Sequence, residues 1–251
     1  MASTIIPTKP RALTAADYEA FAQKYLHSLP LEHFMESTGQ STQREITLES
    51  MALLKVRRPD VQVFSELLVQ YTVPGQRRPG QVVPDNMVVI SEKPVQATTC
   101  FNQALQSAKP FWVLEYVSKS NKRKDYEDNF KKYERDLKVP YYLTFHPDDQ
   151  DLRLHHHNGK KYVAVKPNKH GRLPIPELDL EIGLLDGWVR FWYLGKLLPL
   201  PAEIQRELVE TRESLAAAEQ RIAKAEAEIA QLRAALKQHT VEGANGQNSG
   251  T

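Results

Sequence analysis

PDNMVVI at residues 84–90 and FWVLEYV at residues 111–117 are the two apolar runs that decide the fold of this chain. Short runs rich in valine, phenylalanine and tryptophan are typical of buried strands. Each run carries one carboxylate: Asp85 directly follows a turn proline, and Glu115 interrupts the apolar segment. Because a carboxylate inside such a strand is costly to bury without a positive partner, these two residues are the first candidates for a functional site.

Two carboxylates at neighbouring strand ends can hold a hard divalent cation such as Mg²⁺, which prefers oxygen ligands. A metal bound there would polarise a phosphodiester and lower the pKa of a water that attacks it. Acidic residues at strand ends are also common in proteins that hold no metal. A Glu115 that pairs with a lysine or points to solvent would carry no chemistry, and the residues alone leave both interpretations open.

The surrounding sequence predicts a sheet with one helical crossover. Strands are expected at about residues 61–72, 82–90, 111–117, 140–146, 151–157 and 160–166. Asn158-Gly159 between the last two strands is a strong hairpin signal. The charged segment 125–137 has Phe130, Tyr133 and Leu137 at helical steps. A strand, a helix and a strand in this order predict a crossover unit.

Two helices are predicted before the first strand. Thr14 is the predicted N-cap of a helix that runs to about Leu26, because Asp17 lies in its first turn and aromatic residues recur at helical spacing. A second helix is expected over about residues 41–55. Residues 1–13 contain two prolines and no periodic pattern, so we expect a flexible N-terminus.

After Pro201 the apolar residues follow a heptad pattern. One core position holds Leu208, Leu215, Ile222, Ile229 and Leu236, and the other holds Ile204, Thr211, Ala218, Ala225 and Leu232. The pattern predicts a coiled-coil helix over residues 201–239 through which the chain forms a homo-oligomer, by contacts of residues 203–238. The alternative, a helix folded back onto its own domain, would need a broader apolar stripe. Residues 240–251 are polar and rich in glycine and asparagine, which predicts a disordered tail.

Composition narrows the classes of protein. The net charge of +2, from 33 Lys and Arg and 31 Asp and Glu, is too small to indicate a nucleic-acid binder, so such a surface must come from local segregation of charge. Cys100 is the only cysteine, which excludes an intrachain disulfide and predicts a cytoplasmic protein. The apolar stretches are far shorter than the roughly 20 residues of a spanning helix, so no membrane partner is expected.

An ordered set of motifs carries a resemblance to a known family. The set comprises Pro84-Asp85 with its apolar strand, Val113-Leu114-Glu115-Tyr116-Val117-Ser118, Asp125, Tyr133 and Val139-Pro140-Tyr141-Tyr142. It resembles the Uma-type restriction endonuclease family of the PD-(D/E)xK nuclease superfamily, over roughly residues 30–185. The resemblance implies an α/β fold with a restriction-endonuclease-like mixed β-sheet core flanked by helices. It also implies Mg²⁺ or Mn²⁺ as cofactor and DNA as substrate.

Carried over residue by residue, the resemblance makes Asp85 and Glu115 the metal-binding carboxylates. Two positions depart from the family: Asn129 stands where the family has a lysine, and Lys119 stands where it has a proline. The family's lysine would stabilise the transition state or orient the attacking water, and asparagine carries no charge. Lys132, three residues further along the predicted helix, is the expected substitute because it shares a helical face with Asn129.

The resemblance also suggests further site residues. Glu45, in the second predicted helix, is a candidate third carboxylate, and the alternative is a solvated helix residue. Four positive side chains follow the Glu115 strand: Lys119, Lys122, Arg123 and Lys124. As DNA-binding residues they would neutralise backbone phosphates in a sequence-independent contact. As an alternative they form a solvated turn.

The sequence therefore predicts a metal-dependent DNA endonuclease with its nuclease-like domain over residues 14–200. The rival interpretation is a catalytically impaired nuclease-fold protein that binds DNA or acts as a scaffold and self-associates through the same coiled coil. Asn129 favours the rival, whereas Asp85 and Glu115 favour the enzyme.

Overall fold

The computed structural model describes residues 12–29, 37–95, 97, 99–117 and 125–246, with side chains up to Arg233 except those of Asp125 and Tyr126. The chain divides into two compact units, Met1–Leu198 and Pro199–Thr251. No helix among the described residues combines the length and the apolar character that crossing a membrane requires.

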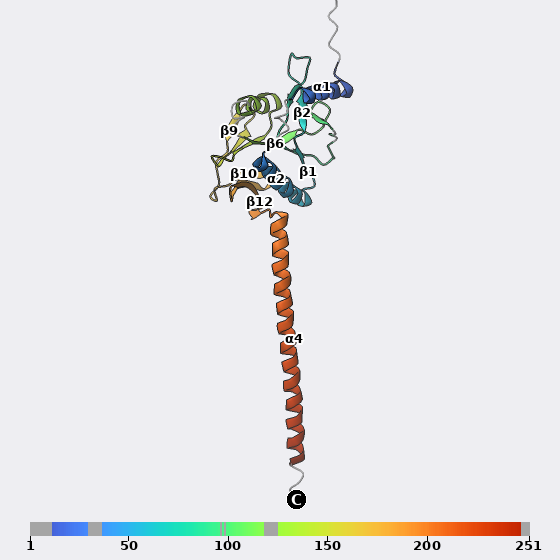
Figure 1. Ribbon diagram of the computed structural model, residues 1–251, viewed down its shortest axis with the longest axis vertical. Helices are drawn as coiled ribbons and strands as arrows, with labels where there is room; N and C mark the ends of the chain where they lie inside the picture. The colour runs from blue at the N-terminus through green and yellow to red at the C-terminus, as the bar shows by residue number, and fades with distance from the viewer. Residues whose placement is uncertain (1–11, 30–36, 96, 98, 118–124, 247–251) are drawn as a thin grey trace, which may run out of the picture. The chain divides into compact units, whose positions relative to one another are not determined.

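The first unit is built on a six-stranded mixed sheet, which confirms the predicted α/β class (Figure 1). Its strands, in spatial order, are β1 (Val61–Ser65), β4 (Asn86–Ile90), β6 (Pro110–Tyr116), β7 (Tyr141–His146), β8 (Asp151–His157) and β9 (Tyr162–Ala164). β6 and β7 are parallel, as the predicted crossover requires, and the other neighbours are antiparallel. β8 and β9 form the hairpin predicted from Asn158-Gly159.

The crossover between β6 and β7 is helical but wound more loosely than an α-helix. It contains two π-helical segments, η2 (Asp125–Asn129) and η3 (Lys132–Leu137), and ends at Lys138 with a left-handed backbone (φ 50°). Tyr133 and Leu137 are buried by this segment. Hydrogen bonds from residue i to i+5 widen each turn, so residues four apart share a face more closely here than residues three apart.

Two smaller sheets flank the main one. The strands of one, in spatial order, are β3 (Gly80–Val82), β2 (Leu68–Tyr71) and β5 (Cys100–Asn102). The strands of the other, in spatial order, are β10 (Leu173–Ile175), β11 (Leu180–Leu185), β12 (Trp188–Tyr193) and β13 (Lys196–Leu197). The short 3-10 helix η4 (Pro176–Leu178) follows β10. The predicted strands 61–72 and 82–90 are therefore each divided in two. The first breaks at Glu66, whose backbone is left-handed (φ 50°), and the second breaks at Pro84-Asp85.

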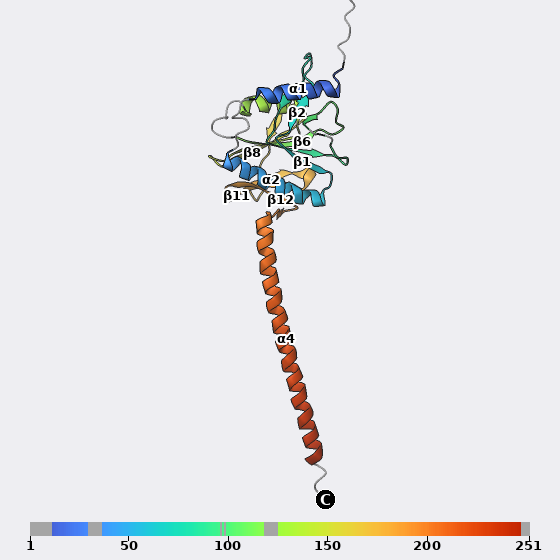
Figure 2. The same cartoon turned by 45° about the vertical axis from the view of Figure 1, so that its right-hand side comes forward.

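The helices α1 (Ala15–Ser28) and α2 (Thr38–Arg57) lie on opposite sides of the main sheet (Figures 1 and 2). The predicted N-cap is confirmed: the Thr14 side chain accepts a hydrogen bond from the Asp17 backbone, and the Asp17 carboxylate accepts one from the Thr14 backbone. α2 begins earlier than predicted, after the N-cap Ser37. The Gln43 amide of α2 donates to Val189 O at 3.1 Å and accepts from Val189 N at 2.8 Å, which joins α2 to β12.

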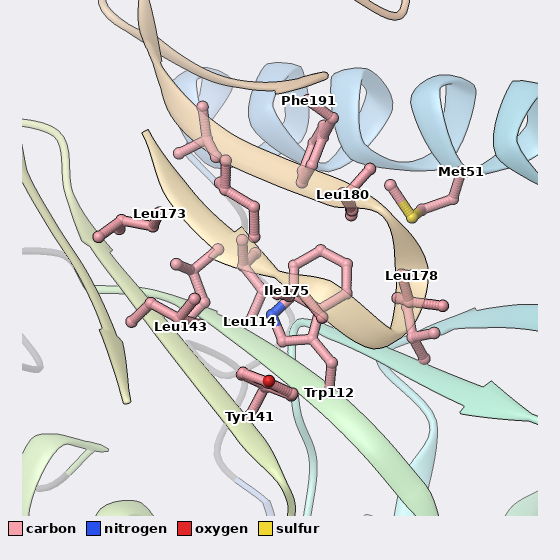
Figure 3. Packing of buried hydrophobic residues seen from close by; sticks show 14 of the residues in the cluster. Met51, Trp112, Leu114, Tyr141, Leu143, Leu173, Ile175, Leu178, Leu180 and Phe191 are labelled. Carbon is pink, nitrogen blue, oxygen red and sulfur yellow. The ribbon is translucent and has the colours of Figure 1, made fainter. Parts of the chain in front are cut away.

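The two faces of the main sheet bury different clusters. Trp112 of β6 packs on Phe191 of β12 with ring centroids 5.7 Å apart, and Met51 of α2 completes this side (Figure 3). Val113 and Tyr142 belong to the opposite cluster, beneath the crossover. Because side chains alternate along a strand, Glu115 of β6 projects on the side of Val113.

The second unit is a single helix, α4 (Pro201–Gly246). The helix extends beyond the predicted end at residue 239, so residues 240–246 are helical although the sequence predicted a disordered tail from 240. Residues 247–251 and most of the predicted flexible N-terminus (1–11) lie outside the described residues. Large aliphatic residues of the predicted seam, Ile204 to Leu232, are between 39% and 63% exposed.

Candidate active site

Strand register and one hydrogen bond bring the two candidate carboxylates to the same end of the β4–β6 pair. β4 and β6 are antiparallel, with Met87 opposite Val113 and Asn86 opposite Leu114. Asp85 lies directly before β4, and its side chain accepts a hydrogen bond from the backbone N of Tyr116. Asp85 therefore contacts the residue next to Glu115, although the two acidic residues are 30 positions apart in sequence.

Asp85 accepts hydrogen bonds from the end of β6 and from the start of α2. Its Oδ2 accepts a hydrogen bond from the backbone N of Tyr116 at 2.5 Å, and its Oδ1 accepts one from Gln40 Nε2 at 3.1 Å. Gln40 lies in the first turn of α2, where the partial positive charge of the helix N-terminus favours a nearby carboxylate. These contacts orient the Asp85 carboxylate while it remains partly exposed.

Glu115 is buried, with 5% of its surface exposed, and it is held from the crossover. Its Oε1 accepts hydrogen bonds from the Tyr133 hydroxyl at 2.6 Å and from Asn129 Nδ2 at 3.4 Å. Burial, followed by the charge of Glu115, raises the pKa of Tyr133 well above its usual value, and the charge of Asp85 contributes in the same direction. Tyr133 therefore stays protonated and donates to Glu115.

The crossover also shows what the Asn129 departure means. Asn129, at the family's lysine position, donates a hydrogen bond to Glu115 from its neutral side-chain amide. Asn129 and Tyr133 are four residues apart and meet the same carboxylate oxygen, as the wide turn of a π-helix allows. Lys132 is partly buried at the first position of η3. The reason for choosing Lys132, an α-helical face shared with Asn129, does not hold in this wider turn.

The remaining candidates from the sequence are placed elsewhere or are not described. Glu45 is exposed on α2, where its charge, after the effect of burial, raises the pKa of Glu49. The contact of α2 with Asp85 is made by Gln40 instead. The proposed DNA-binding residues Lys119, Lys122, Arg123 and Lys124 lie outside the described residues.

The structure adds a row of polar residues that the sequence did not reveal. Thr144 of β7 is the register partner of Glu115 on one side and of Arg153 on the other. Its hydroxyl is buried, with the residue 1% exposed, and finds no hydrogen-bond partner among the described residues. His146, two residues on, is also buried. Alternate polar residues in the otherwise apolar strand Tyr141–His146 were the signal available in the sequence.

The donor set fits a hard divalent cation. Asp85, directly before β4, and Glu115 of the adjacent β6 each accept hydrogen bonds from neutral donors. Mg²⁺ is commonly bound through one or two carboxylates while waters and substrate phosphates complete its shell. Within the part of the chain that the structure describes, no group of three or more His, Cys, Asp or Glu side chains is placed to hold a metal. Asp85 and Glu115 would hold the ion, with waters and substrate phosphates as its other ligands.

Replacing Tyr133 by phenylalanine is expected to weaken Mn²⁺ binding about 10- to 100-fold, because a ligand that loses its orienting hydrogen bond binds metal less tightly. The lost buried hydrogen bond should also lower the free energy of unfolding by about 1–3 kcal/mol. Calorimetric titration with Mn²⁺ and urea unfolding measure the two effects. The matched control is Tyr162→Phe, which removes a buried hydroxyl that donates to Val139 O. Equal Mn²⁺ affinity in the two variants would show that Tyr133 has a structural role only.

Comparisons with known proteins agree with the family expected from the motifs. The model of the family Uma2, described as "Putative restriction endonuclease", matches residues 32–186, which is more than half of the chain. Among solved structures, the chain is similar to a "putative nuclease belonging to DUF820" from Anabaena variabilis ATCC 29413. The two share 14% sequence identity over 57% of this chain and 75% of that chain, with a TM-score of 0.43. No curated protein matches the chain.

Proposed function

The chain belongs to the Uma2 family of restriction endonuclease-like proteins, and from this premise we propose that it is a metal-dependent endonuclease that hydrolyses phosphodiester bonds in DNA. The observation that carries the proposal is the hydrogen bond from the Tyr116 backbone N to Asp85, which brings Asp85 to the residue next to Glu115. Family membership supports a nuclease-type activity on DNA. The oriented carboxylate pair supports a bound divalent cation.

Each residue of the site has a distinct role in this proposal. Asp85 and Glu115 would hold Mg²⁺ or Mn²⁺, which when bound activates the phosphodiester and a water molecule. Gln40 and the Tyr116 backbone fix the direction of the Asp85 carboxylate. Tyr133 fixes Glu115 from the opposite side and stays neutral while doing so. Hydrogen bonds from these neutral donors therefore orient both carboxylates.

DNA is the proposed partner of this site. The basic segment Lys119, Lys122, Arg123 and Lys124 follows β6 in the sequence and carries the positive charge that contacts with DNA phosphates need. Contacts of lysine and arginine with phosphates are sequence-independent and weaken as salt rises. The proposal places the protein in the cytoplasm, the compartment that its single cysteine predicts.

We expect the purified full chain to nick or cut plasmid DNA when Mg²⁺ or Mn²⁺ is added. Gel electrophoresis of supercoiled plasmid distinguishes nicking from cutting through both strands. The reaction should stop in excess chelator and return when the metal is restored, because the two carboxylates alone do not activate water. Equal cleavage in the presence of chelator would contradict a metal-dependent mechanism.

The α-helical spacing that suggested Lys132 is absent, but Lys132 is partly buried in η3 next to Tyr133, and on this ground it stays the proposed cation in place of the family's lysine. Lys132→Ala is expected to slow cleavage about a hundredfold, the usual cost of losing one electrostatic group that acts on the transition state. Single-turnover rates at saturating Mg²⁺ measure this effect. The control is Lys131→Ala, at the exposed neighbouring position. If Lys132→Ala cleaves at the wild-type rate, Lys132 does not have this role.

The second candidate function is a catalytically impaired nuclease fold that binds DNA or acts as a scaffold. The neutral amide of Asn129, placed at Glu115 where the family has a lysine, favours it. Both candidates include self-association through residues 203–238. DNA binding without cleavage under every metal condition would support this second function over the enzyme.

A further inference from the structure

Charged residues flank the exposed seam of α4 in a regular order. We label as g the position before each residue of the Leu208 series, and as e the position after each residue of the Ile204 series. The g positions include Glu207, Ser214, Arg221 and Glu228, and the e positions include Arg212, Glu219, Glu226 and Arg233. All eight side chains are exposed. They are therefore available to pair with a second helix.

In a parallel pair of helices in register, each g side chain faces the e side chain five residues later on the partner. This arrangement pairs Glu207 with Arg212 of the second copy. It likewise pairs Arg221 with Glu226, and Glu228 with Arg233. The fourth contact, Ser214 with Glu219, is neutral. Every charged contact in this set is between opposite charges, and each occurs twice in a symmetric dimer.

An antiparallel pair with full overlap brings g to g and e to e instead. Arg221 would then meet Arg221 of the second copy, and Glu219 would meet Glu219, both at the centre of the helix. The pair Arg212 and Glu226 is attractive in that arrangement, but it is offset by these like-charge contacts. Since charges at e and g select the orientation of coiled coils, the pattern favours parallel helices.

We infer that α4 forms a parallel, in-register, two-stranded coiled coil with a second copy of this chain. Small residues at Ala218 and Ala225 of one core position allow close approach, while leucine and isoleucine at the other supply apolar area. The inference rests on the self-association included in the proposed function and is independent of DNA cleavage.

Parallel pairing has a consequence that follows from chain connectivity. α4 begins at Pro201, directly after the first unit ends at Leu198. Both nuclease-like units of a parallel dimer are therefore attached at the same end of the coiled coil. In an antiparallel dimer they would be attached at opposite ends, separated by roughly 50 Å for a helix that rises about 1.5 Å per residue. The parallel dimer fits a partner that two sites engage together, namely one DNA duplex.

A charge-exchange cycle on the full chain tests the orientation. Glu207→Arg and Arg212→Glu are each expected to weaken the dimer about tenfold, because each replaces attraction with repulsion at two symmetric contacts. The double variant should restore wild-type affinity. Arg206→Glu is the matched control, since Arg206 is exposed and lies on the side of the helix away from the seam. Analytical ultracentrifugation gives the dimer dissociation constants.

The alternative orientation gives a different pattern. In the antiparallel pair Glu207 faces Ala235, so Glu207→Arg would have little effect on dimer affinity. Position 212 faces Glu226 in that pair, so Arg212→Glu would weaken the dimer, and the double variant would stay equally weak. That result overturns the inference, and so does a monomeric wild type, which also removes the proposed self-association. Restored affinity in the double variant supports the inference whether or not the protein cleaves DNA.

Disulfide trapping gives a second readout. In a Cys100→Ser background, Ile204→Cys is expected to form a covalent dimer with itself on oxidation, because a parallel register sets position 204 opposite its own copy. A mixture of Ile204→Cys and Leu236→Cys chains should give little crosslinked heterodimer. Heterodimer without self-crosslinking at 204 would show antiparallel helices.

Discussion

Asp85→Ala is expected to abolish DNA cleavage, because the metal loses an anionic oxygen ligand that no neighbouring group can replace. Asp85→Asn should have the same effect. Asparagine keeps an oxygen that can accept a hydrogen bond from Gln40 or from the Tyr116 backbone N. Loss of cleavage in the Asp85→Asn variant would therefore show that the negative charge of Asp85 is required. Glu115→Gln should likewise abolish cleavage. Plasmid cleavage in Mg²⁺, with thermal melting to verify folding, measures these variants.

Glu45→Gln is the matched control for this prediction. It removes a carboxylate from α2 at an exposed position, so cleavage is expected to continue at the wild-type rate. If Glu45→Gln also abolishes cleavage, Glu45 is the third carboxylate that the family resemblance suggested. Wild-type activity in a folded Asp85→Ala or Glu115→Gln variant would overturn the two-carboxylate assignment.

Changing Ile222 and Ile229 together to aspartate is expected to make the protein monomeric. Each aspartate would place a charge in the apolar seam, at a cost of several kcal/mol as an order of magnitude. An exposed stripe of large aliphatic residues is seldom tolerated by a soluble monomer, so we expect the wild type to be a dimer. Light scattering after size exclusion should show half the wild-type mass, while circular dichroism shows that the β-sheet unit remains folded.

Ala223→Asp with Ala230→Asp is the matched control. It adds the same two charges one position further along the helix, outside the seam, where both residues are exposed. This variant should keep the mass of the wild type. An unchanged mass for the Ile222 and Ile229 variant, or a wild type that is already monomeric, would mean that α4 does not mediate self-association.

The strands of the main sheet could be predicted from the sequence because their residues are locally distinctive. The apolar runs at β4, β6 and β7 and the Asn158-Gly159 turn gave their positions. The division of strand 61–72 could not be predicted, since Glu66 is not a residue that favours a left-handed backbone. In the β10–β13 sheet, β10 and β13 have only three and two residues, too few for a strand pattern. β11 and β12 have six residues each, and no strand was predicted there.

The carboxylate pair was predictable, but most of its supporting residues were not. Asp85 and Glu115 lie in recognisable strands and match a family motif. Gln40 and Thr144 have no local signal, because their places at the site depend on how α2 packs and on the β6–β7 register. The π-helical turn at Tyr133 depends equally on tertiary packing, since no sequence periodicity distinguished it from an α-helix.

The bond between Gln43 and Val189 has a consequence for biosynthesis. The two hydrogen bonds join residues 146 positions apart in sequence. The contact between α2 and β12 can therefore form only after nearly the whole first unit has left the ribosome. Chains grow at about 5–20 residues per second, which gives a delay on the order of ten seconds. Gln40, which donates to Asp85, lies one turn before Gln43 on α2. A nascent chain therefore lacks the hydrogen bonds between α2 and β12 until synthesis has passed β12.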